Sequence, residues 1–122
     1  MPNFGRNLGL NHPPVNQLQL RGCVIAPAQL FLNRRGQPRL TFRLEVRCDD
    51  RDLPPKKPAG VDYFSVVAFG PAFIPLQAQL VAGREVHLTG RLRSRDIESN
   101  GVPRVVIEVV AKEIIPLGRF AP

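Results

Sequence analysis

The sequence predicts an all-β fold of five strands, with one short helix between the third and the fourth. Two features predict it. Apolar and polar residues alternate over most of the chain between residues 16 and 115, as on half-buried strands. Gly, Pro and Asn separate the alternating runs at positions typical of turns. The 122 residues suit one domain with one core, and a hydrophobic content of 43% indicates a folded chain.

The first long strand and its return are expected within residues 16–35. In NQLQLRGCVI (16–25), every second residue from the first leucine is apolar or glycine, which is the pattern of a strand with one buried face. Gly22 within this run predicts a bulge or a sharp bend. Residues 28–35 continue as an extended segment, and the sequence RRGQ (34–37) predicts a turn.

The second and third strands are expected over residues 40–46 and 62–70. The second places alternate apolar residues inward: Leu40, Phe42, Leu44 and Val46. The third, DYFSVVAFG, has two largely apolar faces: Phe64, Val66 and Ala68 on one, and Tyr63, Ser65, Val67 and Phe69 on the other. Only one of these faces can be core, so the other needs a different cover.

The short helix and the last two strands follow. PAFIPLQAQLVAG (71–83) predicts a helix with Pro75 in its first turn and Gly83 at its end, and with Phe73, Leu76 and Leu80 on one face. Residues 84–95 predict a strand with Val86, Leu88 and Leu92 inward. A hairpin turn over 96–103, containing Asn100-Gly101, leads into the last strand over 104–115.

This element order is that of the OB-fold, a five-stranded Greek-key barrel. Three segments are expected: an extended N-terminal arm over residues 1–15, the OB domain over 16–115, and a short C-terminal tail over 116–122.

The charge indicates an anionic partner. The formal net charge is +7, and 14 of the 17 basic residues are arginine. A strongly basic domain has the electrostatic footprint of a nucleic-acid binder, although a merely solvated basic surface has the same composition. A membrane surface is disfavoured, because no basic amphipathic helix and no apolar run of about 20 residues is present.

The sequence resembles the bacterial single-stranded DNA-binding proteins from Asn16 to about Glu113. The resemblance rests on NQLQLRG near the start, on Gly36 and Phe42-Arg-Leu44, and above all on VVAFG followed by a short helix and GREVHLTGRLRSR. It implies an OB-fold subunit that forms a homodimer or homotetramer and binds single-stranded DNA largely without sequence preference, in replication, recombination or repair.

The resemblance implies that bases stack on Tyr63 and Phe69. Independently, their even spacing of six residues places both side chains on one face of the strand, because side chains alternate between the two faces. A loop or a partner subunit covering them is the alternative. Arg91, Arg93 and Arg95 occupy every second position of a strand and so share one face, where they could contact successive phosphates of the DNA backbone. Further basic candidates for phosphate contact are Arg34, Arg35, Arg43, Arg47, Lys56, Lys57 and Arg104.

The sequence also departs from that family. It has no tryptophan, it has Ile97 where another aromatic is common, and its last residues, EIIPLGRFAP, lack the acidic cluster by which cellular members recruit enzymes. The chain is therefore also similar to the primosomal replication protein N type, a dimeric relative that assists replication-restart helicases. Tailless accessory single-strand binders of mobile elements remain a further alternative.

Two other functions stay open. A protein-interaction adaptor would bind a helicase or recombinase through apolar positions such as Val15, Ile25, Phe31 and Phe64. RNA is an alternative ligand, because stacking and phosphate contacts do not exclude a 2′-hydroxyl.

No enzyme, cofactor or metal site is predicted. His12 and His87 lack partners at catalytic spacing, and Asp49, Asp50 and Asp52 lack the spacing of a calcium loop. Cys23 and Cys48 are expected as free thiols, with a disulfide as the alternative. The first residues lack a signal-peptide pattern, so we expect a cytoplasmic, nucleoid-associated protein.

Overall fold

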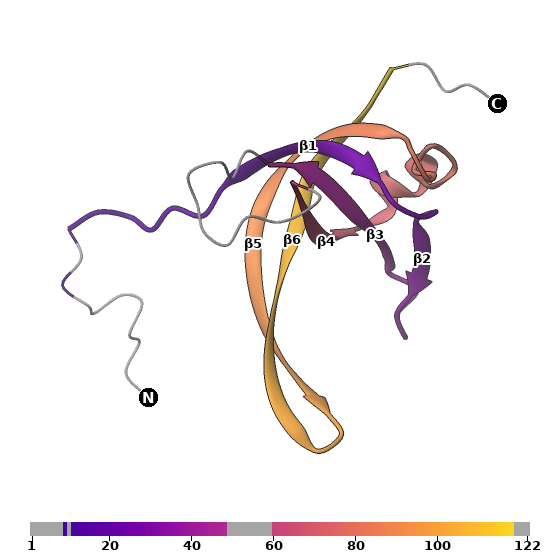
Figure 1. The fold of residues 1–122 in the computed structure, drawn as a ribbon. Helices are drawn as coiled ribbons and strands as arrows, with labels where there is room; N and C mark the ends of the chain where they lie inside the picture. Colours follow the sequence, from indigo (N-terminus) through magenta and orange to yellow (C-terminus); the bar gives the residue numbers. More distant parts are fainter. Residues whose placement is uncertain (1–8, 10, 49–59, 119–122) are drawn as a thin grey trace.

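The computed structural model describes residues 9, 11–48 and 60–118, and its strands form one sheet that closes on itself (Figure 1). The strands are β1 (Leu18–Val24), β2 (Gln29–Leu32), β3 (Pro38–Arg47), β4 (Val61–Phe69), β5 (Glu85–Ser99) and β6 (Val102–Leu117). Their order is β1-β5-β6-β4-β3-β2, and pairing of β1 with β3 closes the ring. The predicted OB barrel is confirmed.

The extended segment expected over residues 28–35 contains strand β2 (Gln29–Leu32). Residues 28–35 do not form the return of one long strand, because β2 is a separate short strand that pairs along β3. The chain leaves β1 through Pro27, which has no N–H to donate to a ladder, and the Ala28 N–H binds the Leu80 carbonyl instead. The sheet therefore has six strands.

The core lies inside the ring and is built from the inward residues of the predicted strands. Its most deeply buried side chains are Leu40, Leu44, Leu80, Leu88, Val24, Val66, Val86 and Val109. Phe64, which the adaptor hypothesis placed at an interface, packs half-buried against this core. The alternation of the sequence thus identified most of the core.

The helix between β4 and β5 is the 3₁₀ helix η1 (Pro71–Gln79). It begins at Pro71, so Pro75 lies in its interior and not in its first turn; Pro75 cannot donate the hydrogen bond that a regular α-helix needs there. Phe73 and Leu76 pack against the core, as predicted. No helix in the described ranges is long and apolar enough to cross a membrane.

The barrel closes at Gly22. From Leu18 to Cys23, β1 pairs with β5 without a register shift, so of the two alternatives predicted at Gly22, a bulge or a sharp bend, the bulge is wrong. At its end β1 meets β3, and a Cβ on Gly22 would lie 2.1 Å from the Glu45 carbonyl oxygen. Glycine is required because two backbones approach closely here.

The bulge lies instead between Thr89 and Gly90 of β5. A Cβ on Gly90 would lie 2.1 Å from the Val110 carbonyl oxygen, so this position also requires glycine. Pairing with β1 ends at Gly90, so β1 does not cover the next inward position. Leu92, which was expected in the core, is therefore 45% exposed.

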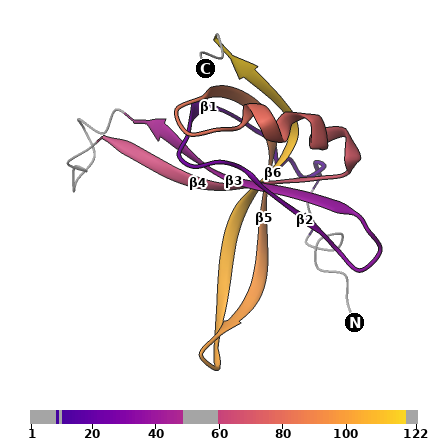
Figure 2. The ribbon, with the colours of Figure 1, turned by 90° about the vertical axis from the view of Figure 1, so that its right-hand side faces the viewer.

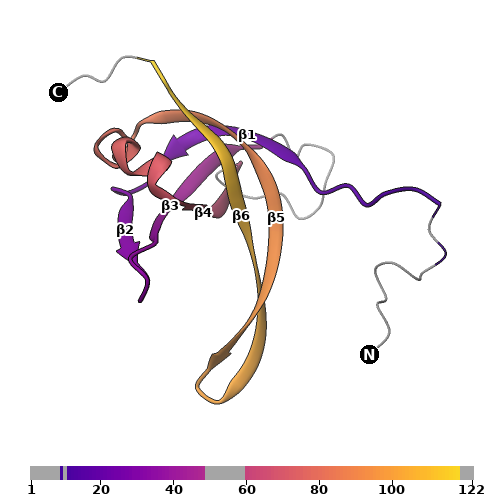
Figure 3. The same ribbon diagram turned by 180° about the vertical axis from the view of Figure 1, so that it is seen from behind.

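Beyond the barrel, β5 and β6 pair only with each other and project as a two-stranded arm, residues 91–108 (Figures 2 and 3). The turn is the two residues Asn100 and Gly101, with φ of 52° and 76°. Both values are typical of a type I′ hairpin. The predicted turn over 96–103 was too long, because the strands continue to Ser99 and restart at Val102.

Candidate nucleic-acid interface

The outer face of β4 carries two exposed aromatic side chains. Tyr63 is 51% exposed and Phe69 is 45% exposed, and they lie six residues apart on the same face. Six residues of strand span ~20 Å. Val67, between them on that face, is only 2% exposed, although alternation places it on the face away from the core. It lines a pocket together with Arg95 and Glu108 of the arm.

Phe69 belongs to a row of alternating rings and guanidinium groups that crosses the sheet. Strand register places Phe31 of β2 opposite Arg39 of β3, and Arg39 opposite Phe69 of β4. The Arg39 guanidinium lies 5.0 Å from the centre of the Phe31 ring, and that of Arg93 lies 5.0 Å from the centre of the Phe69 ring. We call these four residues the cation–aromatic row.

Two members of this row were missed as nucleic-acid contacts. Phe31, expected only as a protein contact, is 42% exposed within the row, and Arg39 had no predicted role. The hairpin turn at residues 33–37 could have revealed their pairing, since it places Phe31 and Arg39 opposite each other.

Tyr63 has its own cationic neighbour. The Arg43 guanidinium lies 5.7 Å from the centre of the Tyr63 ring. Both are exposed on the same outer face, and Arg47 lies on that face four residues beyond Arg43 on β3. Each end of the outer face of the sheet therefore has an exposed aromatic ring next to an arginine: Phe69 with Arg93 at one end, and Tyr63 with Arg43 at the other.

The arm brings its predicted arginines to this face, but two of them share a carboxylate. Arg93 pairs with Glu108 in strand register and forms an ion pair with it. The Nε atoms of Arg93 and Arg95 donate hydrogen bonds to Glu108 Oε1 at 3.1 and 3.0 Å. Glu108 thus holds the Arg93 guanidinium close to Phe69 and neutralises part of the charge that was assigned to phosphates.

Glu108 has a lowered pKa. Burial alone would raise the pKa of its carboxyl, but the hydrogen bonds and positive charges of Arg93 and Arg95 outweigh burial and hold the pKa below its usual value. A carboxyl whose pKa is depressed on folding stabilises the fold fully above its unfolded pKa, about 4.3 for glutamate. The stabilisation is lost as pH falls through the lower pKa of the folded state.

Glu108→Gln is therefore expected to reduce the loss of stability on acidification. Urea midpoints at neutral pH and below about pH 4 measure it. The midpoint of the original protein should fall by more than that of Glu108→Gln, while Glu113→Gln, an exposed glutamate of the same strand, should behave like the original. Equal falls for Glu108→Gln and the original protein would contradict the assignment.

The other predicted basic residues are distributed around this face. Arg91 is exposed and shares strand parity with Arg93 on the arm, and Arg104 is exposed opposite Ile97. Arg34 and Arg35 are exposed at the β2–β3 turn, which Asn33 holds by accepting the N–H of Arg35 at 2.8 Å. Lys56 and Lys57 lie outside the described residues.

The remaining chemistry of the described residues is sparse. No group of three His, Cys, Asp or Glu side chains comes together there in a way that could hold a metal ion. Cys23 and Cys48 are not joined by a disulfide. The aspartates at 49, 50 and 52 lie outside the described ranges.

The fold and this surface define an OB barrel with an exposed aromatic and cationic face. The chain belongs to the Single-strand binding protein family, whose sequence profile matches residues 15–117. Among solved structures it is similar to a chain of a Plasmodium falciparum SSB complex with ssDNA, with a TM-score of 0.71 and 21% identity. The match covers 89% of this chain and 100% of that one. No curated protein is significantly similar in sequence.

Proposed function

We propose that this chain binds single-stranded DNA through the outer face of β2, β3 and β4 and the facing side of the arm. The observation that carries the proposal is the cation–aromatic row, with Phe31 and Phe69 exposed beside Arg39 and Arg93. Exposed rings stack with any base, and arginine contributes phosphate contacts and cation–π stacking. Membership of the Single-strand binding protein family supports the same function.

The proposed binding is non-enzymatic and largely independent of sequence. Stacking accepts every base, because every base has a π-face, and phosphate contacts contain no sequence information. The chain would protect or present unpaired strands in replication, recombination or repair. A strand enters because its bases are unpaired, so duplex DNA should bind more weakly at the same salt concentration.

The phosphate contribution can be isolated at Arg43. Arg43→Ala is expected to make the slope of log K against log salt less steep by about 0.7, the value for one phosphate contact on a single strand. The measurement is a salt titration of fluorescent oligo(dT) binding. Arg21→Ala is the matched control, because it removes the same charge from an exposed position of β1, opposite His87. Equal slopes for both variants, or equal binding of duplex, would contradict the proposal.

A second candidate function is protein binding by the other side of the arm. That side exposes an apolar stripe: Leu92, Val105 and Ile107 are 45%, 66% and 66% exposed. Exposed apolar patches commonly mark protein interfaces. We propose that this stripe is covered either by further copies of the chain, as a homodimer or homotetramer, or by a replication-restart partner. Light scattering distinguishes the two: a multiple of 13.6 kDa supports self-association, and a monomer mass supports a separate partner.

A further inference from the structure

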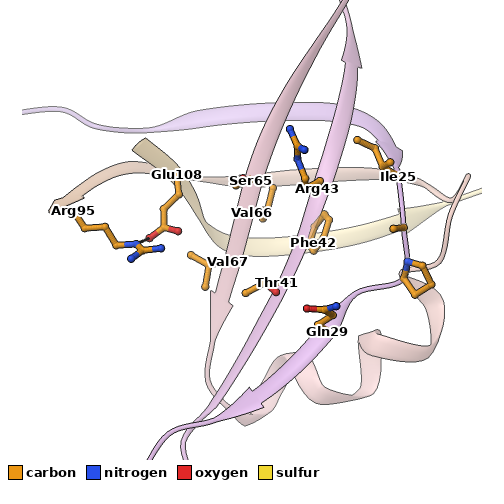
Figure 4. A pocket seen from close by; sticks show the side chains of 12 residues that line it. Ile25, Gln29, Thr41, Phe42, Arg43, Ser65, Val66, Val67, Arg95 and Glu108 are labelled. Atoms are coloured by element: carbon orange, nitrogen blue, oxygen red, sulfur yellow. Dashed lines mark hydrogen bonds and ion pairs between the residues drawn. The ribbon is translucent and has the colours of Figure 1, made fainter. Parts of the chain in front are cut away.

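A pocket lies between Tyr63 and Phe69 on the binding face, because Ser65 and Val67, which separate these rings on β4, line it. Figure 4 shows the side chains that line the pocket. The pocket has a volume of about 410 Å³ and crosses β2, β3 and β4. Strand register places Gln29 opposite Thr41, and Thr41 opposite Val67. On each strand these residues lie two positions from the members of the cation–aromatic row, which are Phe31, Arg39 and Phe69. Because these side chains, with Ser65, are smaller than the rings on either side, the face is concave here.

The pocket combines apolar side chains with groups that can form hydrogen bonds. Val67, which is 2% exposed, contributes an apolar side chain to the lining. Thr41 and Ser65 contribute hydroxyl groups, which both donate and accept, and Gln29 contributes an amide with separate donor and acceptor atoms. An apolar pocket with a few convergent polar groups is the usual form of a small-ligand site, and its volume is in the ordinary range.

The surroundings of the pocket favour part of a nucleic-acid strand as its occupant. Figure 4 shows Arg95 and Glu108 on one side of the pocket and Ile25 on the other. Arg43 also lines it, so cationic groups lie on the same face where a strand's phosphates would pass. Tyr63 and Phe69, on either side of the pocket, would stack with neighbouring bases. A base between those two would then face the pocket.

We propose that this pocket takes one unpaired nucleobase edge-on and reads it through the Gln29 amide, with adenine preferred. A glutamine amide can bind the N6 amino group and N7 of adenine together, whereas thymine offers an acceptor and a methyl group at that edge. The proposal rests on the function proposed above. It adds a base preference at one position to binding that is otherwise tolerant of sequence.

The test compares the affinity for oligo(dT) with that for the same oligonucleotide carrying one central dA. The original protein should bind the dA-containing strand about fivefold more tightly, the lower end of the discrimination that one bidentate contact supplies. Gln29→Ala should bring this ratio close to one. Gln19→Ala, which removes an exposed glutamine from β1 opposite Thr89, should keep the ratio of the original protein.

A second variant guards against misfolding. Thr41→Val removes a hydroxyl from the pocket while keeping a β-branched residue, and it should also lower the ratio. If Gln29→Ala still binds the dA-containing strand more tightly, stacking is the cause of the preference, and the proposed reading of adenine by the pocket is wrong. Equal affinities for both strands in the original protein would also overturn the pocket while leaving single-strand binding intact. Failure to bind oligo(dT) at all would overturn the proposed function itself.

Discussion

Phe69→Ala is expected to weaken single-stranded DNA binding by about 1–3 kcal/mol, which is roughly 5- to 150-fold in Kd. Phe69 is 45% exposed, pairs with Arg39 across the strands and lies beneath the Arg93 guanidinium. Its removal therefore takes away a stacking surface and the ring against which one arginine is ordered. Fluorescence anisotropy with labelled oligo(dT) at low salt measures the effect.

The fold should tolerate Phe69→Ala, because the lost ring lies outside the core. Its thermal midpoint should stay close to that of the original protein. The matched control is Ile115→Ala, which truncates a similarly exposed apolar residue, 49% exposed, opposite His87 on the barrel. Full binding by Phe69→Ala, or an equal loss with Ile115→Ala, would contradict a stacking role for this ring.

Gly22→Ala is expected to destabilise the barrel by about 3 kcal/mol or more. The added Cβ would lie 2.1 Å from the Glu45 carbonyl oxygen, and both groups belong to backbone that the sheet holds in place. Relief would require β1 to separate from β3, which is the contact that closes the ring. Urea unfolding followed by circular dichroism measures the loss.

Gly36→Ala separates this clash from the general cost of replacing glycine. Gly36 has a φ of +75°, and a Cβ added there would meet nothing within 4 Å, so alanine should cost only about 1 kcal/mol in backbone strain. Equal losses for the two variants would mean that the close approach of β1 to β3 does not limit stability.

The strands and the core could be predicted because alternation reports burial directly. Leu40, Phe42 and Leu44 were assigned inward from parity alone, and all three are buried. Parity also placed Tyr63 and Phe69 on one exposed face. Parity fails where the sheet ends or bulges: Leu92 has the correct spacing for the core, but pairing with β1 stops before it.

Contacts across strands were harder to predict, because they depend on register. The Asn100-Gly101 turn fixes the register of the arm, and reading it as a two-residue turn would have placed Glu108 opposite Arg93. The pairing of Arg39 with Phe69 could not be read in this way. The connection between β3 and β4 is long and rich in proline, so its length does not set which residues face each other.

The most direct test of single-strand binding uses Tyr63 as its own reporter. The chain has one tyrosine and no tryptophan, so its intrinsic fluorescence reports this ring alone. Titration with oligo(dT) at low salt should quench the emission saturably, duplex DNA should quench it far less, and added salt should restore it. Unchanged Tyr63 emission while the strand binds, or equal quenching by duplex, would contradict a face built to stack unpaired bases.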